Sequence, residues 1–167
     1  MPEIFISYIH EDETIAKALQ KLLEAKLPSV GVFVAGDQLR LGDEWLSKIR
    51  AALKSAKVIL ALFSPAAIER PWVHFEAGGA WFSDGKTLIP ICIGHLRPEN
   101  LPKPYSNIQG ASLETSWWYI IQDLWGVLEL KGIPPSPFED EDVKALSEAL
   151  GQWNAERART AYKREDA

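Results

Sequence analysis

Short apolar runs alternate with amphipathic helical patterns along most of this chain, and this alternation is the feature that most restricts its fold. The run at residues 58–63 is unbroken, as in a strand that helices cover on both faces. Strands that alternate with helices in this way predict βα units, a parallel sheet and right-handed crossovers. We therefore predict an α/β fold, a flavodoxin-like three-layer sandwich around a central parallel five-stranded sheet. The predicted strands are residues 4–8, 30–35, 58–63, 87–93 and a short edge strand at 107–111, with helices at 15–27, from 43, from 71 and at 114–130.

The C-terminal region has a different pattern from the rest of the chain. Pro134 and Pro135 interrupt it, so we divide the chain into a domain at residues 1–132 and a proline-containing linker with a helix at 133–167. The segment from Ser136 to Glu139, with proline at its second position, predicts a capping box that begins this helix. Its narrow apolar stripe either docks on the domain or pairs with another chain, and we expect docking. The stripe consists of Val143, Leu146, Leu150 and Trp153.

Composition limits the partners and the location of the protein. The chain has 167 residues and a net charge of −5, which argues weakly against a surface for nucleic acid or anionic membranes. It contains no apolar run long enough to cross a bilayer, and its start lacks the pattern of a signal peptide. The single cysteine, Cys92, lies in an apolar run and is expected to be a small buried hydrophobic residue. We expect a cytoplasmic protein with no direct nucleic-acid or membrane partner.

Several kinds of reaction centre do not fit the sequence. The three histidines are scattered and none has metal-ligand spacing to another, so we expect no metal site. His74 and Glu76 match the first half of a zinc deaminase signature, but the required cysteine pair is absent. No glycine-rich phosphate loop follows the first strand, and no serine–histidine–acid set can be named.

The carboxyl edge of the predicted sheet is the expected ligand site, because ligands of open α/β sheets bind there. It comprises residues 8–10, the loop at 36–42 and residues 64–72. The aromatic side chains Tyr8, Trp45 and Trp72 could stack on a nucleotide base, and Arg40 could bind phosphate. Glu76 lies four residues after Trp72 and would share a helical face with it. Residue type alone favours a surface acid for Glu76, and it fits Arg40 equally well as an ordinary loop cation.

Three ordered motifs resemble those of the Toll/interleukin-1 receptor (TIR) domain family, in its bacterial NAD-cleaving branch. The first is residues 4–8, followed by the acids Glu11 and Asp12. The second runs from residue 32 to 45 and is similar to the family's BB loop. The third is residues 64–65, followed by Trp72 and then Glu76 at the spacing of the family's catalytic glutamate. The resemblance covers about residues 3–130.

The resemblance implies cleavage of the nicotinamide–ribose bond of NAD+, with NAD+ as the substrate and no bound cofactor. A single carboxylate suits this reaction, because nicotinamide leaves as a neutral molecule and needs no general acid, unlike the alkoxide of most glycosidases. What remains is to stabilise an oxocarbenium-like ribose, which a nearby carboxylate does electrostatically. We assign this catalytic role to Glu76. The expected substrate-binding residues are Ser7, Tyr8, Ile9, Arg40, Leu41, Trp72 and Phe75.

The family also implies a role and partners. The expected products are nicotinamide with ADP-ribose or a cyclic ADP-ribose isomer, in bacterial (antiphage) immune signalling. Activity would follow self-association into a homo-oligomer through TIR–TIR contacts of the 36–42 loop, with a sensor or effector protein as a further partner. The alternative is a non-catalytic TIR–TIR interaction or scaffold module. A third interpretation, a nucleotide-binding sensor or a nucleoside deoxyribosyltransferase relative, follows from fold analogy only.

Overall fold

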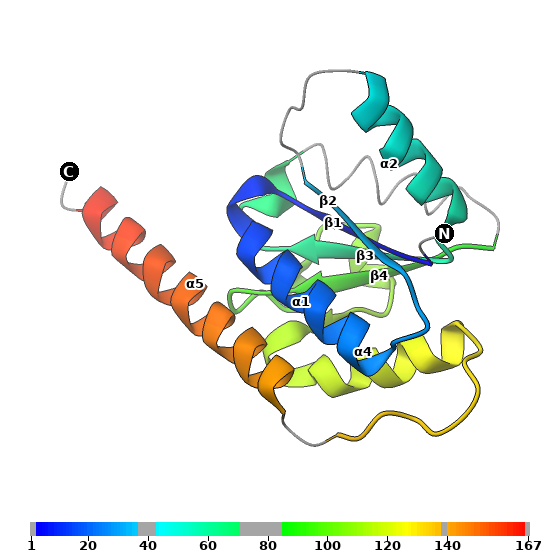
Figure 1. The fold of residues 1–167 in the computed structure, drawn as a ribbon. Helices are drawn as coiled ribbons and strands as arrows, with labels where there is room; N and C mark the ends of the chain where they lie inside the picture. The colour runs from blue at the N-terminus through cyan, green and yellow to red at the C-terminus, as the bar shows by residue number, and fades with distance from the viewer. Residues whose placement is uncertain (1–2, 37–42, 71–84, 138–139, 166–167) are drawn as a thin grey trace.

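The computed structural model describes residues 3–36, 43–70, 85–137 and 140–165, and these contain one parallel sheet (Figure 1). Five strands lie in the order β2-β1-β3-β4-β5, which confirms the predicted flavodoxin-like sandwich. Ser7 of the first strand lies opposite Ala35 on one neighbour and Ala61 on the other. The strands are β1 (Ile4–Tyr8), β2 (Val32–Gly36), β3 (Val58–Phe63), β4 (Thr87–Cys92) and β5 (Ala111–Ser112).

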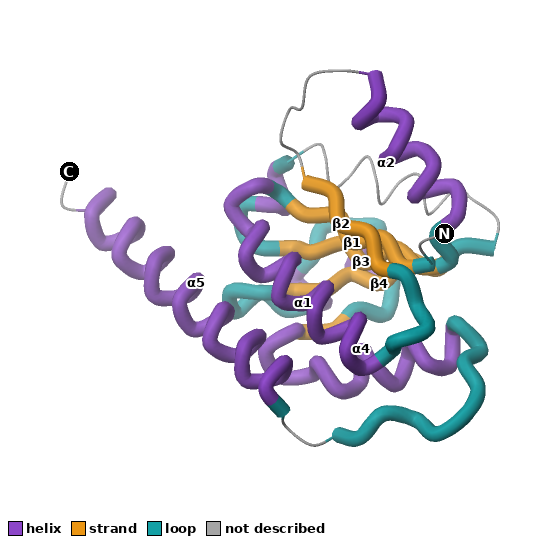
Figure 2. The backbone as a smooth tube through the Cα atoms, viewed as in Figure 1, coloured by secondary structure: helices purple, strands orange, loops and turns teal. Residues whose placement is uncertain are grey.

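Helices cover both faces of the sheet (Figure 2). One face packs against α1 (Glu13–Lys26), α4 (Leu113–Val127) and α5 (Glu141–Glu165), with Ile4 and Ile6 in that core. The other face packs against α2 (Asp43–Ser55), with Phe5 in the core. Successive residues of β1 thus enter opposite cores, as the two-residue period of a strand requires. Because β1 and β3 are buried along their whole length, an unbroken apolar run is the pattern that a central strand needs.

Several predicted boundaries differ from the structure, most of them by one to three residues. The edge strand expected at 107–111 is only β5, because residues 105–107 form a 3-10 turn. Pairing of β5 is confined to Ile91 and Cys92 of β4, and the preceding residue, Pro90, has no N–H to donate to a ladder. The strand expected from residue 30 begins at Val32. The helix expected from residue 71 lies outside the described residues.

The C-terminal helix α5 docks on its own domain, as its stripe predicts, but it begins later than the capping box predicted. Its four stripe residues are all buried in the core that α1 shares. Asp140 caps α5, because its Oδ1 accepts the backbone N–H groups of Asp142 and Val143, each at 3.1 Å. Its other oxygen accepts a hydrogen bond from Lys26 at the end of α1. The predicted start at Ser136 was therefore wrong, since a contact with α1 fixes the cap.

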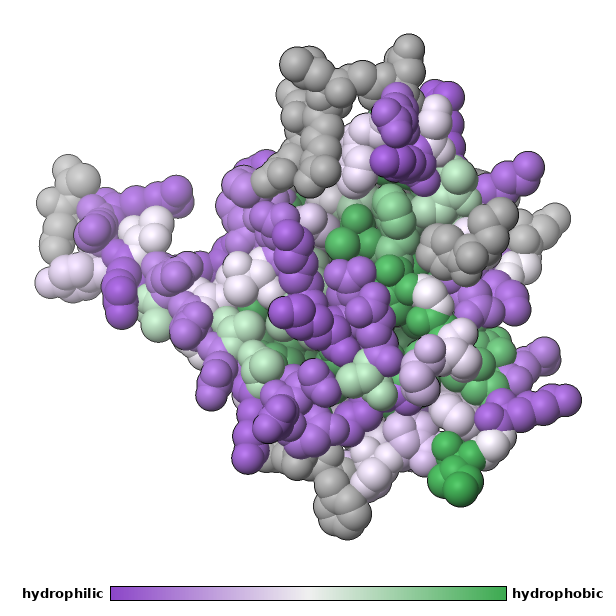
Figure 3. Space-filling view, in the orientation of Figure 1, coloured by the Kyte–Doolittle hydropathy of each residue, from purple (hydrophilic) through white to green (hydrophobic). Residues whose placement is uncertain are grey.

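The far end of α5 extends beyond the sheet (Figure 1), and hydrophilic residues cover most of it (Figure 3). Tyr162 is the exposed aromatic side chain there. Among the described residues, no helix is both long enough and apolar enough to cross a membrane.

Candidate functional site

Three of the expected substrate-binding residues, Ser7, Tyr8 and Ile9, lie at the carboxyl end of β1. Ser7 is fully buried, and its hydroxyl has no hydrogen-bond partner among the described residues. A buried hydroxyl without a partner costs about 1–3 kcal/mol, so a position like this needs a compensating gain elsewhere. Ile9 is buried in the core on the α2 side of the sheet.

Tyr8 and Trp45, two of the aromatic residues expected at the rim, line the same hollow of about 300 Å³. Phe33 and Gly36 of β2 complete its apolar part. A larger residue at Gly36 would displace the Tyr8 ring, since a Cβ atom would lie 2.6 Å from Cε2 of Tyr8. The hollow runs along β2 from Val32 to Gly36, with Glu13, Lys17 and Gln20 of α1 also lining it, so an aromatic or sugar ring could pack beside this strand.

The remaining expected site residues are Arg40, Leu41, Trp72, Phe75 and the catalytic candidate Glu76. All five lie outside the described residues. The last described residues before Glu76 are a short 3-10 turn at Ala67–Glu69 and the residue that follows it, Arg70.

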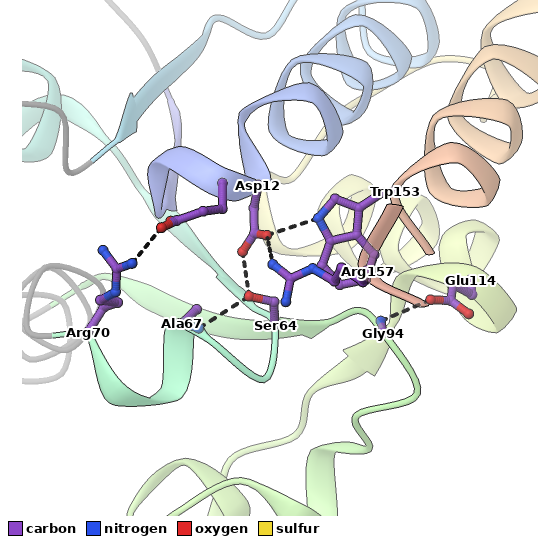
Figure 4. Close-up of polar contacts among 9 residues, drawn as sticks. Asp12, Ser64, Ala67, Arg70, Gly94, Glu114, Trp153 and Arg157 are labelled. Atoms are coloured by element: carbon purple, nitrogen blue, oxygen red, sulfur yellow. Dashed lines mark hydrogen bonds and ion pairs between the residues drawn. The ribbon is translucent and has the colours of Figure 1, made fainter. Parts of the chain in front are cut away.

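A polar cluster that the sequence did not single out lies at the carboxyl ends of β1 and β3 (Figure 4). Its centre is Asp12, which is fully buried. Oδ2 of Asp12 accepts a hydrogen bond from the Ser64 hydroxyl at 2.5 Å. Oδ1 accepts one from Nε1 of Trp153 at 3.0 Å and one from Arg157 at 3.0 Å. Desolvation raises the pKa of Asp12, although the Ser64 hydrogen bond and the Arg157 charge act in the opposite direction.

The turn that follows β3 is tied to this cluster at both ends. The Ser64 hydroxyl accepts the backbone N–H of Ala67 at 3.2 Å, so it orders the 3-10 turn. At the end of the turn, Arg70 forms an ion pair with Glu11. The pKa of Glu11 is lowered, first by a hydrogen bond to its own backbone N–H and further by Arg70.

Trp153 of α5 fills the crevice above this cluster. A Cβ atom on Gly94 would lie 2.7 Å from Cη2 of the indole and 3.3 Å from Cδ of Pro65. The guanidinium of Arg157 lies over the indole, 3.9 Å from its centroid. The indole is thus enclosed by the chain that follows β1, β3 and β4.

Comparison with known proteins identifies the family. The family model described as "TIR domain" matches residues 4–119, which is more than half of the chain. This chain belongs to the TIR domain family. A search of the curated proteins finds no relative.

Solved structures with a similar fold include two TIR structures at 15% identity. The RPS4 and RRS1 TIR domain heterodimer covers 91% of this chain and 95% of its own, with a TM-score of 0.45. The TIR domains of the activated Roq1 resistosome cover 90% of this chain and 84% of their own, also with a TM-score of 0.45. A response regulator receiver protein from Burkholderia phymatum, 15% identical, covers 83% of this chain and 100% of its own, with a TM-score of 0.48.

The TIR match begins in β1 and ends within α4, so it includes the Asp12 carboxylate but not α5. The two donors that α5 supplies to Asp12 therefore come from outside the matched TIR region. Neither can be found from the TIR motifs, because Trp153 and Arg157 are 141 and 145 residues away from Asp12.

Two further features bear on what a TIR domain of this kind could bind. The hollow beside α5 measures about 550 Å³ and is lined by Arg70, Arg157 and Arg164 together with Glu11 and Glu156. In the described part of the chain, no group of three histidine, cysteine or acidic residues could hold a metal ion.

Proposed function

We propose that this TIR domain is an NAD+ nucleosidase in which Glu76 is the catalytic carboxylate. The observation that carries the proposal is the TIR match over residues 4–119, within which Glu76 has the spacing from Trp72 of the family's enzymatic members. The family includes domains of immune signalling, some of which cleave NAD+. The site would lie at the carboxyl edge of the sheet, where α/β folds bind nucleotides.

The reaction breaks the N-glycosidic bond, and its electron pair leaves with nicotinamide, which departs neutral. The ribose becomes oxocarbenium-like, and the Glu76 carboxylate stabilises that positive charge. Water then adds to the anomeric carbon and loses a proton, giving ADP-ribose. Attack by a nitrogen of the adenine ring instead gives a cyclic isomer. Neither outcome requires a metal or a bound cofactor.

The described residues support the binding part of the proposal. The Ser7 hydroxyl is a donor without a protein partner among the described residues, but it is fully buried, so a ribose hydroxyl or a phosphate oxygen would reach it only if binding opens the end of β1. The hollow lined by Tyr8 and Trp45 offers aromatic faces for a ring of the substrate. Arg40, Leu41, Trp72, Phe75 and Ile9 complete the proposed contacts.

The proposal includes activation by self-association, with the 36–42 loop in TIR–TIR contacts and a sensor or effector as trigger. We place this activity in the cytoplasm, in bacterial antiphage signalling. If assembly completes the site, the rate of NAD+ cleavage per molecule rises with protein concentration. A rate per molecule that stays constant over the range in which oligomers form would contradict this part of the proposal.

The test of catalysis compares wild-type protein with Glu76→Gln, incubated with NAD+ at high concentration or clustered on a surface. We measure nicotinamide release by chromatography. Glu69→Gln is the matched control, because Glu69 is an exposed glutamate seven residues earlier in the chain. Removal of one preorganised charge typically lowers kcat about 10²–10³-fold. We expect such a loss in Glu76→Gln and none in Glu69→Gln.

Equal release by the wild type and Glu76→Gln would exclude Glu76 as the catalytic residue. Absence of release from clustered wild-type protein would instead favour the non-catalytic TIR–TIR interaction module. A variant of the proposed binding residues separates binding from chemistry: we expect Ser7→Ala to raise KM, since it removes a donor to the substrate and leaves the carboxylate unchanged.

A further inference from the structure

The helix α5 lies outside the TIR match, yet it completes the hydrogen bonding of a buried residue within it. Asp12 is inaccessible to solvent and accepts three side-chain hydrogen bonds, two of which come from α5 (Figure 4). A buried carboxylate is strongly destabilising unless donors or cations compensate it. The indole N–H of Trp153 and the guanidinium of Arg157 provide this compensation only while α5 is docked.

The same carboxylate also controls the turn that leads toward the candidate catalytic residue. Asp12 accepts a hydrogen bond from the Ser64 hydroxyl, which leaves the Ser64 lone pairs directed toward the backbone N–H of Ala67. Ala67 begins the 3-10 turn, and the turn ends at Glu69, next to Arg70. Arg70 is held by Glu11, the neighbour of Asp12. The segment after β3 is thus held by two successive acids that follow β1: Asp12 contacts Ser64, and Glu11 contacts Arg70.

We propose that Asp12 is a positioning residue, through which the docked helix α5 holds the turn at residues 64–70 and so affects the rate of the reaction assigned to Glu76. The inference rests on the proposed function, because it concerns the site of Glu76. Loss of the α5 donors leaves Asp12 with one partner, so its carboxylate rotates or takes up water and the Ser64–Ala67 contact weakens. A displacement of about 1 Å at a reacting group can lower a rate about 100-fold.

The experiment uses the 167-residue chain and three variants. Trp153→Phe removes the indole donor and keeps an aromatic ring in the crevice. Arg157→Gln removes the charge from a side chain that is one-third exposed, so it preserves the fold even where the tryptophan variant does not. Lys26→Met is the matched control, because it removes the anchor of α5 at the opposite end, with Asp140, and leaves the Asp12 contacts in place.

We measure three quantities for each variant: kcat and KM for nicotinamide release, the unfolding midpoint in urea, and hydrogen exchange at the amide of Ala67. We expect Trp153→Phe and Arg157→Gln to lower kcat by tenfold or more with little change in KM. We also expect exchange at Ala67 to become at least tenfold faster. Lys26→Met should shift the urea midpoint and leave both kcat and the Ala67 exchange rate close to wild type.

Two results would overturn the inference. One is wild-type kcat and wild-type Ala67 exchange in both Trp153→Phe and Arg157→Gln. The other is a loss of kcat in all three variants in proportion to their loss of stability, since that would show α5 to be a structural support only. If the wild type cleaves no NAD+, the proposed function fails, while exchange at Ala67 still decides whether α5 holds the turn.

Discussion

Gly94, two residues after the end of β4, offers the sharpest test of how α5 docks. It has φ +71°, in the left-handed region, and the ring of Trp153 lies directly over it. A Cβ atom at this position would be 2.7 Å from Cη2 and 2.8 Å from Cζ3 of the indole. Gly94→Ala therefore introduces two separate penalties, one in the backbone and one against the ring.

The size of each penalty can be estimated. A left-handed backbone conformation costs an alanine about 1–2 kcal/mol relative to the right-handed one. An added methyl group in a filled site costs about 1–3 kcal/mol, because the ring is held by Asp12 and cannot move aside without losing a hydrogen bond. We expect Gly94→Ala to lower the free energy of unfolding by about 2–5 kcal/mol, a large part of the stability of an ordinary domain.

Gly85→Ala is the matched control for the backbone penalty. Gly85 has φ +79°, and a Cβ atom there would meet no atom of the described residues within 4 Å. This variant carries the conformational penalty without the contact, so we expect a loss of about 1–2 kcal/mol. The difference between the two alanine variants measures the contact with Trp153.

A double-mutant cycle with Trp153→Ala completes the test, with urea unfolding followed by circular dichroism. Trp153→Ala alone should cost about 3–5 kcal/mol, since it empties a buried site. In that background, Gly94→Ala should retain its backbone penalty and the close contact with Cδ of Pro65, so the two changes should be less than additive by about 1–3 kcal/mol. Strict additivity, or equal losses for Gly94→Ala and Gly85→Ala, would refute the docking of the indole against Gly94.

Three further predictions concern single groups. The pKa of Asp140 is lowered, chiefly by its hydrogen bond from Lys26, so its stabilising effect is present above its ordinary pKa and is lost as pH falls through the lowered value. We expect Asp140→Asn to lower the free energy of unfolding in urea at pH 7 by less than about 1 kcal/mol, and by progressively less as pH falls below the ordinary pKa of an aspartate. Burial raises the pKa of Cys92 to about 12, so a thiol reagent at pH 8 should react with it only after denaturation. Lys86 donates hydrogen bonds to the carbonyl oxygens of Leu53 and Ala56 at the end of α2. We expect Lys86→Met to lower the free energy of unfolding by about 1–3 kcal/mol and to accelerate amide exchange in the last turn of α2.

The sheet could be predicted from the sequence because burial on both faces leaves a direct pattern. The strand predicted at residues 58–63 is the observed β3, and residues 4–8 are the observed β1. The edge of the sheet and the start of α5 could not be predicted in the same way. They depend on Pro90 in a neighbouring strand and on a contact between Asp140 and Lys26, neither of which a local pattern contains.

The residues of the candidate site could likewise be predicted only where a local sequence pattern marks them. The motifs led to Ser7 and Tyr8 at the carboxyl edge, because the end of a buried strand can be recognised locally. Asp12 drew no attention beyond its place in a motif, since an acid at the start of a helix usually faces solvent. Its burial results from Trp153 and Arg157, and only the folded chain brings these residues together.

The polar contacts of α5 explain why this helix can hold one position on α1. Its buried stripe has only four apolar residues, and apolar contacts alone tolerate a slip of one helical turn, about 5.4 Å. Such a slip would separate Asp140 from Lys26 at one end and Trp153 from Asp12 at the other. The second loss is the greater one, because it leaves a buried carboxylate without its main donors, at a cost of about 3–5 kcal/mol. The two anchors therefore select a single register, and Asp12 supplies more of that selection than the pair of Lys26 and Asp140. A variant with leucine at position 12 should accordingly fold, but with α5 less uniquely placed, which line broadening of the Trp153 indole resonance would detect.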